Sequence, residues 1–176
     1  MSLTLEERFE KMKQIRNELL QFKESPLYQY RVDNKFFPVV GEGSHTAHIM
    51  FIGEAPGKNE AETGRPFCGK SGKVLDDMLD SIKLNRSDVY ITNVVKDRPQ
   101  ENRDPTEEEI KVYAPFLERQ IEIIQPNVIA TLGIAGLMAF LFLAYKIAKL
   151  IKHTDGTGLS LTLRALVIGI SVYMLF

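Results

Sequence analysis

Residues suited to ligand chemistry gather in three short stretches of this 176-residue sequence. They are Gly53-Glu54-Ala55-Pro56-Gly57, Gly64-Arg65-Pro66-Phe67 and Thr92-Asn93-Val94-Val95-Lys96. The first stretch directly follows an apolar run, 48–52, which is typical of a buried strand that ends in a polar loop. Open α/β folds bind ligands in such loops, at the carboxyl ends of parallel strands. We therefore expect residues 53–67 to form a ligand-binding loop.

Alternating strand and helix patterns surround this loop. Strand patterns cover about 48–52, 88–95 and 127–133, and helix patterns cover about 71–82 and 106–124. Such units in succession predict a parallel sheet covered by helices, with right-handed crossovers. Residues 165–173 provide a candidate last strand. The expected fold class is α/β, a three-layer α/β/α domain with a central, mostly parallel four-stranded sheet.

The N-terminal part is expected to be a helix followed by a long connection. Thr4-Leu5-Glu6-Glu7 has the form of a capping box. Apolar residues then recur at helical spacing, at Leu5, Phe9, Met12, Ile15 and Leu19. Residues 1–24 thus predict an amphipathic N-terminal helix, whereas residues 23–46 show no clear period. A single domain, 1–176, is the simplest organisation for a chain of this length.

The composition excludes a globally basic nucleic-acid-binding protein. The net charge is −1 and 26% of the residues are charged, so any contact with nucleic acid must be a local patch. Cys68 is the single cysteine, which excludes an internal disulfide and cannot by itself build a cysteine-ligated metal site. This content fits a reducing compartment, and residues 1–24 lack the pattern of a signal peptide. We expect a cytoplasmic protein.

Two interpretations are open for the C-terminal quarter. Residues 128–145 are eighteen consecutive uncharged residues with lysines following, which is the lower limit for a transmembrane helix. The alternative is a strand through Gly133 and a buried helix over about 135–151. We favour the alternative, because the preceding strand–helix units require a continuation, and we expect no stable membrane association. Residues 134–176 form an atypical C-terminal segment.

The three stretches, together with Asn102-Arg103-Asp104-Pro105, resemble the uracil-DNA glycosylase superfamily. The similarity covers about residues 20–133 and is closest to the family 4 enzymes, the thermostable, iron–sulfur type. It implies a monofunctional enzyme that flips uracil out of DNA and hydrolyses its N-glycosidic bond with water, leaving an abasic site. Uracil-containing DNA is the partner that the resemblance implies, and we expect a monomer.

The resemblance also implies roles for individual residues. Phe67 matches the residue that stacks on the base, and Asn93 matches the amide that reads the uracil edge. Glu54 would lie beside the flipped nucleotide, and Glu60 on the side where a thymine methyl would clash. The implied catalytic residues are Glu54, Glu60 and Asn93, and the implied substrate-binding residues are Gly53, Ala55, Pro56, Gly57, Phe67 and Asn93. Core packing for Phe67, a strand-end turn for Asn93 and a solvated carboxylate for Glu60 are the structural alternatives.

Charge placement adds two expectations. Ala55 lies where family 1 enzymes carry an aspartate that orients water, so catalysis should depend on leaving-group stabilisation and substrate electrostatics. Cations near loop ends predict a track for the DNA backbone, because parallel strand geometry brings those ends to one sheet edge. These cations are Lys70, Lys73, Lys96, Arg98 and Arg103.

Two features of the family 4 pattern are missing from the sequence. The four cysteines that hold a four-iron, four-sulfur cluster in those enzymes align with Phe22, Ser25, Asp97 and Tyr113. Because all four ligands are replaced, we expect no iron–sulfur cluster, no metal and no other cofactor. The second missing feature is the His-Pro segment after the fourth strand, whose histidine donates toward uracil O2. Nothing after residue 133 matches it, and the late His153 has different neighbours.

The missing histidine leaves two functional alternatives. The chain is either an active glycosylase that lacks one donor, or a catalytically impaired relative that binds uracil or DNA. Loss of one such donor costs roughly 100- to 1000-fold in rate. A membrane-tethered protein, anchored by 128–145, is a third and less favoured hypothesis.

Overall fold

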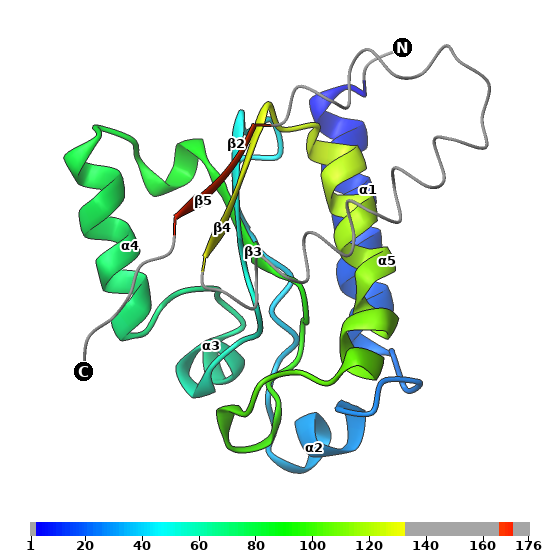
Figure 1. Cartoon of the computed structure of the whole chain (residues 1–176). Coiled ribbons are helices and arrows are strands. Elements are labelled where there is room, and N and C mark those ends of the chain that lie inside the picture. Colours follow the sequence, from blue (N-terminus) through cyan, green and yellow to red (C-terminus); the bar gives the residue numbers. More distant parts are fainter. Residues whose placement is uncertain (1–2, 133–165, 171–176) are drawn as a thin grey trace.

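A five-stranded sheet forms the centre of the computed structural model, which describes residues 3–132 and 166–170 (Figure 1). The strand order is β1-β3-β2-β4-β5. The bounds are β1 (Glu42–Gly43), β2 (Ile49–Gly53), β3 (Tyr90–Asn93), β4 (Val128–Leu132) and β5 (Leu166–Ile170). The last four strands are parallel to one another, as expected, and the structure adds the two-residue β1, which pairs antiparallel with β3.

Helices cover both faces of the sheet, which confirms the α/β class. The helices are α1 (Leu5–Leu20), α2 (Tyr28–Asp33), α3 (Lys58–Thr63), α4 (Lys70–Ser81) and α5 (Glu107–Ile124), with 3-10 turns at Arg86–Asp88 and Gln100–Asn102. Figure 1 shows α1 and α5 side by side on one face and α4 on the other. The short α3 lies beyond the carboxyl end of β2, between the sheet and the loop that precedes α4.

Alternation along the strands gives each sheet face its own core. Tyr90 belongs to the core cluster that contains α1 and α5 residues such as Ile15 and Leu117. Its neighbour Ile91 belongs to the cluster that contains Leu75 and Leu79 of α4. Because successive strand side chains point to opposite faces, β3 contributes to both cores and is buried at every position.

The N-terminal expectations are confirmed in part. The Thr4 capping box is present, and Met12, Ile15 and Leu19 of α1 are buried. Leu5 and Phe9, however, are 64% and 56% exposed, so the first turns of the helix do not pack as the periodicity predicted. Residues 23–46 are also more regular than expected, because they contain α2 and β1.

The C-terminal alternatives are tested over only a few residues. Val128–Leu132 is a strand paired with both β2 and β5, so these five residues are not the start of a spanning helix. The strand predicted over 165–173 is confirmed as β5. The expected helix over 135–151 and His153 lie outside the described residues. Within residues 3–132 and 166–170, no helix combines the length and apolar character needed to cross a membrane.

Candidate active site

The ends of β2 and β3 place the first and third sequence stretches side by side. In the parallel register, Gly53 is opposite Asn93. The pairing continues beyond the strands, because the N–H groups of Val94 and Val95 donate to the carbonyl oxygens of Gly53 and Glu54, each at 2.9 Å. The loop that begins at Glu54 is therefore held against the β3 end by backbone bonds.

Asn93 carries a buried polar atom that has no protein partner. The residue is 1% exposed, and its Oδ1 makes no hydrogen bond within the described part of the chain. Buried amide oxygens are nearly always paired, since leaving one unpaired costs about 1–3 kcal/mol. An unpaired oxygen at a strand end is consistent with a ligand that donates to it.

Gly53 lets two side chains pack directly against its α-carbon. A Cβ atom built on Gly53 would collide with Asn93 Oδ1 and would lie 2.6 Å from Cζ of Phe67. The amide of Asn93 and the ring of Phe67 thus converge on the bare α-carbon of Gly53. The structure brings together these three residues from all three sequence stretches, and a side chain at position 53 would displace the amide or the ring.

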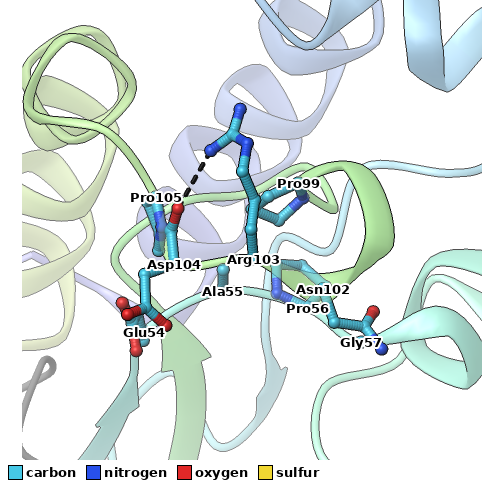
Figure 2. Close-up of a pocket in the computed structure, with 9 residues that line it drawn as sticks. All are labelled: Glu54, Ala55, Pro56, Gly57, Pro99, Asn102, Arg103, Asp104 and Pro105. Atoms are coloured by element: carbon cyan, nitrogen blue, oxygen red, sulfur yellow. Dashed lines mark hydrogen bonds between the residues drawn. The ribbon is translucent and has the colours of Figure 1, made fainter.

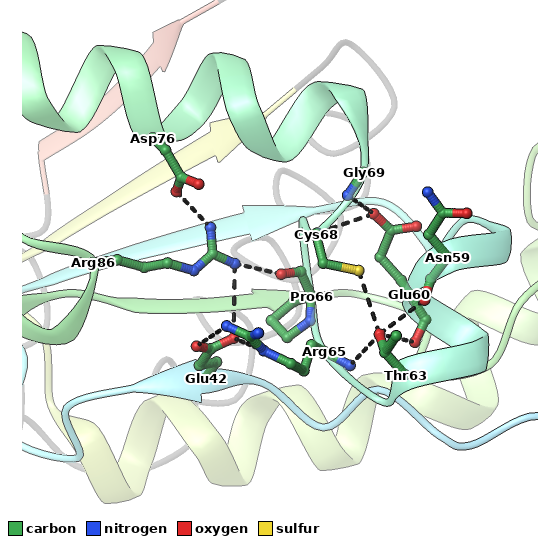
Figure 3. Close-up of polar contacts among 10 residues, drawn as sticks. All are labelled: Glu42, Asn59, Glu60, Thr63, Arg65, Pro66, Cys68, Gly69, Asp76 and Arg86. Atoms are coloured by element: carbon green, nitrogen blue, oxygen red, sulfur yellow. Dashed lines mark hydrogen bonds and ion pairs between the residues drawn. The ribbon is translucent and has the colours of Figure 1, made fainter.

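The Phe67 backbone adopts a conformation that non-glycine residues rarely use. Its φ is +48°, and its carbonyl packs so closely on Gly72 of α4 that a Cβ there would collide with it. Figure 3 shows how the flanking residues are fixed. Arg86 donates to the Pro66 carbonyl and also to Asp76 at 2.8 Å, so the segment is tied to α4. Backbone strain of this kind persists only where surrounding contacts hold it.

Glu60 holds the other side of the Phe67 segment. Its Oε1 accepts from the N–H groups of Cys68 at 3.2 Å and Gly69 at 3.0 Å (Figure 3). Gly69 is the N-cap of α4, so the carboxylate lies at the positive end of that helix. Glu60 is only 8% exposed. It is therefore not a solvated loop carboxylate, and these contacts position the residues that follow Phe67.

A cavity of about 110 Å³ opens next to Glu54 (Figure 2). Its walls come from the loops that follow β2 and β3: Glu54, Ala55, Pro56, Gly57, Pro99, Asn102, Arg103, Asp104 and Pro105. Four of the sequence-predicted substrate-binding or catalytic residues, 54–57, line this cavity, whereas Asn93 and Phe67 do not. Glu54 directly follows Gly53, so the cavity begins one residue after the point where Asn93 and Phe67 meet.

Asp104 is a cavity residue that the sequence analysis did not single out. Figure 2 shows its carboxyl group on the same side of the cavity as that of Glu54. Burial raises the pKa of Glu54, and the negative charge of Asp104 raises it further. The Asn-Arg-Asp-Pro segment carried the signal for this residue, but only the tertiary structure brings it close to Glu54.

The five predicted DNA-backbone cations have different environments. Lys70 and Lys73 are exposed on the first turn of α4. Arg98 donates to Asn102 at 2.7 Å, and Arg103 forms an ion pair with the buried Glu109 at 2.6 Å. The expectation for Lys96 is wrong, because its side chain is fully buried and cannot reach a phosphate. Sequence proximity to the loop could not reveal that this lysine points into the protein.

The four positions aligned with cluster cysteines form a buried contact group. Tyr113 Oη donates to Asp97 Oδ2 at 2.6 Å and lies 2.6 Å from Ser25 Oγ, while the ring of Phe22 packs edge-on against Tyr113. Arg31 completes the group through an ion pair with Asp97 at 2.9 Å. The polar atoms at these positions already bond one another and include no thiolate. They do not fit an iron–sulfur cluster.

Metal ligands do not gather elsewhere in the described structure either. Residues 3–132 and 166–170 contain no group of three histidine, cysteine or acidic side chains arranged to hold a metal ion.

Burial raises the pKa of Asp97, against the lowering effects of Arg31 and of the Tyr113 hydroxyl.

The carboxyl ends of β2 and β3 thus carry a buried amide, an aromatic ring and a neighbouring carboxylate-lined cavity, which is where open α/β folds place their ligand sites. Comparison with known proteins identifies the family. The model of the uracil DNA glycosylase superfamily matches residues 40–169. The chain belongs to this superfamily, as the sequence motifs predicted.

Three of the curated relatives are named Type-4 uracil-DNA glycosylase. The Type-4 uracil-DNA glycosylase of Sulfurisphaera tokodaii is 50% identical over 123 residues, which cover 69% of this chain and 54% of that protein. The Type-4 uracil-DNA glycosylase of Archaeoglobus fulgidus is 56% identical over 95 residues, 54% of this chain and 48% of that protein. That of Thermotoga maritima is 50% identical over 107 residues, which cover 61% of this chain and 56% of that protein. The chain spans about half the length of these curated relatives.

Proposed function

We propose that this protein is a uracil-DNA glycosylase that hydrolyses the N-glycosidic bond of uracil flipped out of DNA. The observation that carries the proposal is the unpartnered Oδ1 of Asn93, buried beside Phe67 above the bare Gly53. Uracil N3–H would donate to this oxygen, and the amide NH2 of Asn93 would donate to uracil O4. Cytosine presents the reverse pattern, an acceptor at N3 and a donor at N4, so the same amide orientation would reject it.

In this proposal the remaining groups act around the flipped nucleotide. Phe67 stacks on the base, and its strained, clamped backbone means that the ring is already in place before DNA binds. Water attacks C1′ of the deoxyribose as the C1′–N1 bond breaks, and the bonding electrons leave with uracil as an anion. The water proton is lost to solvent or to a cavity carboxylate, and uracil is later protonated. The products are uracil and an abasic site.

The carboxylates have separate parts in this proposal. Glu54 and Asp104 face the cavity, where their negative charge would stabilise positive charge that develops on the sugar. Glu60 acts by positioning, since its carboxylate already accepts two backbone N–H groups next to Phe67. Lys70 and Lys73 remain the exposed candidates for contacts with the DNA backbone.

The test is uracil release from single- and double-stranded DNA that contains one uracil. We expect wild type to release uracil, and Asn93→Ala to be slower by on the order of 100-fold, because it removes the group that recognises and stabilises the base. Asn34→Ala, on an exposed amide outside the site, is the matched control and should retain wild-type activity. Equal release by wild type and Asn93→Ala would refute the enzymatic proposal.

A catalytically impaired uracil- or DNA-binding protein is the second candidate. It is favoured by one sequence observation, namely that no His-Pro segment follows residue 133. In that case wild type would bind uracil-containing DNA more tightly than thymine-containing DNA and release no uracil. Fluorescence anisotropy with both DNAs, alongside the release assay, separates the two candidates.

We also propose that the protein works without an iron–sulfur cluster. Support comes from Ser25, Tyr113 and Asp97, which carry oxygen groups at three of the cluster-ligand positions and bond one another and Arg31. Protein purified anaerobically should contain no stoichiometric iron and show no absorption band near 400 nm. Stoichiometric iron would contradict this proposal. The measurement does not depend on whether the enzyme is active.

The remaining expectations are a cytoplasmic location and a monomeric state. Support for the first is the single cysteine, which fits a reducing compartment. Light scattering coupled to size-exclusion chromatography would measure the second, and a mass of about twice the 20.0 kDa of the chain would contradict it.

A further inference from the structure

Lys96 lies directly behind the proposed uracil-reading residue, with its side chain fully buried. Its Nζ donates to the backbone carbonyl of Asn93 at 2.6 Å, to Gln120 Oε1 at 2.6 Å and to Thr92 Oγ1 at 2.8 Å. Thr92 belongs to β3 and Gln120 to α5. The lysine therefore connects the end of β3 to the helix on the face of the sheet opposite α4.

The chemistry of these partners favours the charged form of the lysine. A carbonyl oxygen and an amide oxygen can only accept, and the Thr92 hydroxyl donates its own proton to the Val40 carbonyl at 2.7 Å. All three atoms around Nζ therefore accept, which matches the three N–H groups of an ammonium ion. A neutral amine has two N–H groups and would direct its lone pair at an acceptor.

The ammonium charge has no negative partner among these contacts. All three acceptors are neutral, and Asp97, the next residue, is engaged by Arg31 and Tyr113. Burial lowers the pKa of Lys96 and so favours the neutral amine, whereas the three acceptors favour the ammonium form, because only that form can donate to all of them at once. We take the hydrogen-bond geometry to decide for the ammonium form. A buried charge that is held by hydrogen bonds alone is costly, and such costs are commonly found where the charge serves function.

We propose that Lys96 is a positioning residue for uracil excision, fixing Asn93 through its carbonyl and placing an uncompensated positive charge behind the base. The proposal rests on the proposed function. Lys96 would act through Asn93 and would not touch uracil, because it lies on the α5 side of the sheet whereas the Asn93 oxygen faces Phe67. Its effect would be greatest when negative charge develops on departing uracil.

The test is Lys96→Met, which keeps the length and apolar stem of the side chain and removes the charge and its donors. Single-turnover release from saturating DNA should slow by about 10- to 100-fold, less than for a donor that touches the base directly. Substrates that carry 5-fluorouracil provide the decisive comparison. Fluorine makes the departing base a weaker base, so less charge stabilisation is required and the loss should be clearly smaller.

A purely structural role would give a different result. Misfolding lowers the fraction of active enzyme, which reduces release of uracil and 5-fluorouracil by the same factor. Equal losses in folded Lys96→Met, with folding verified by circular dichroism, would overturn the proposal. Lys11→Met, on an exposed lysine of α1 away from the site, is the matched control and should show wild-type single-turnover rates on both saturating substrates.

A second variant keeps the proposal testable if Lys96→Met does not fold. Thr92→Val is nearly isosteric and removes one acceptor of Nζ while leaving Lys96 in place. Its release rate should fall less than that of Lys96→Met, and the fall should be smaller for 5-fluorouracil than for uracil. Equal losses on the two substrates would again overturn the proposal. If wild type itself releases no uracil, the proposed function fails first, and the inference about Lys96 fails with it.

Discussion

At the scale of single residues, Gly53 allows Asn93 and Phe67 to take the positions they have. The Asn93 amide and the Phe67 ring converge on its α-carbon, so even one methyl group would push one of them aside. Its backbone lies in a strand and does not require glycine for conformation. The missing side chain is needed for space.

Gly53→Ala should therefore reduce uracil release by at least about 100-fold, comparable to the loss of a direct contact to the base. Because Asn93 or Phe67 must move to admit the methyl group, folding of this variant is verified by circular dichroism. Asn34→Ala, on an exposed amide outside the site, is the control and should keep the wild-type rate. The measurement is single-turnover release, and wild-type rates for Gly53→Ala would contradict the proposed position of the base.

Glu54 gives a prediction about stability and pH. Burial and the charge of Asp104 raise its pKa, so the ionised form is less favourable in the folded state than in the unfolded state. The resulting destabilisation is fully present above the raised folded-state pKa. It disappears as the pH falls below the unfolded-state value, near 4.3.

Glu54→Gln removes this destabilisation and should raise the melting temperature at pH 7.5. The difference from wild type should shrink toward pH 4.5, as the carboxyl group becomes protonated. Glu101→Gln, on an exposed carboxylate, is the control and should shift the melting temperature little at either pH. A lower melting temperature for Glu54→Gln at pH 7.5 would show that Glu54 stabilises the fold.

At the scale of elements, the Ser25–Tyr113–Asp97–Arg31 contacts join α2, α5 and the loop after β3. Asp97 and Tyr113 are 1% and 0% exposed, so the ion pair and hydrogen bonds form away from water. Removal of one partner leaves the other buried and unsatisfied. The loss of folding stability is larger when the group left without a partner is charged.

Arg31→Met should destabilise the protein by about 3–5 kcal/mol, because it leaves the buried Asp97 without its ion-pair partner. Tyr113→Phe removes one hydroxyl and should cost only about 1–3 kcal/mol. Urea unfolding measures both values. If Tyr113→Phe costs more than Arg31→Met, the ion pair is not the main support of these contacts.

At the scale of the whole molecule, α4 and α1 lie on opposite sides of the sheet, and only α4 begins beside the site (Figure 1). The net charge of −1 provides no general attraction to DNA. Binding should therefore depend on cations near the site, of which Lys70 and Lys73 are exposed. Each phosphate contact contributes about 0.7 to 0.9 to the slope of log affinity against log salt.

The double variant Lys70→Gln, Lys73→Gln should lower that slope by about 1.4 to 1.8 if both lysines contact phosphates. Lys11→Gln with Lys13→Gln, on α1, changes the charge equally and should leave the slope unchanged. Fluorescence anisotropy across a series of salt concentrations measures both. Equal slopes for the two double variants would place the DNA elsewhere.

The sequence by itself indicated the alternation of the parallel strands with the long helices, the α/β class and the family, but not α2, α3 or β1. Capping boxes at Thr4 and Thr106 and the apolar runs of β2, β3 and β4 are local signals, so short-range patterns were enough to find them. The motifs also indicated Phe67 and Asn93, which the structure brings together at Gly53.

Only the tertiary structure decided which side of an element each polar group faces. Lys96 and Arg98 are two residues apart, yet one is fully buried and the other is partly exposed at the loop surface. The hydrogen bond from Arg86 to the Pro66 carbonyl, and the repulsion between Glu54 and Asp104, involve residues separated along the chain by about 20 and 50 positions. Such contacts arise from packing between elements, which no local sequence pattern records.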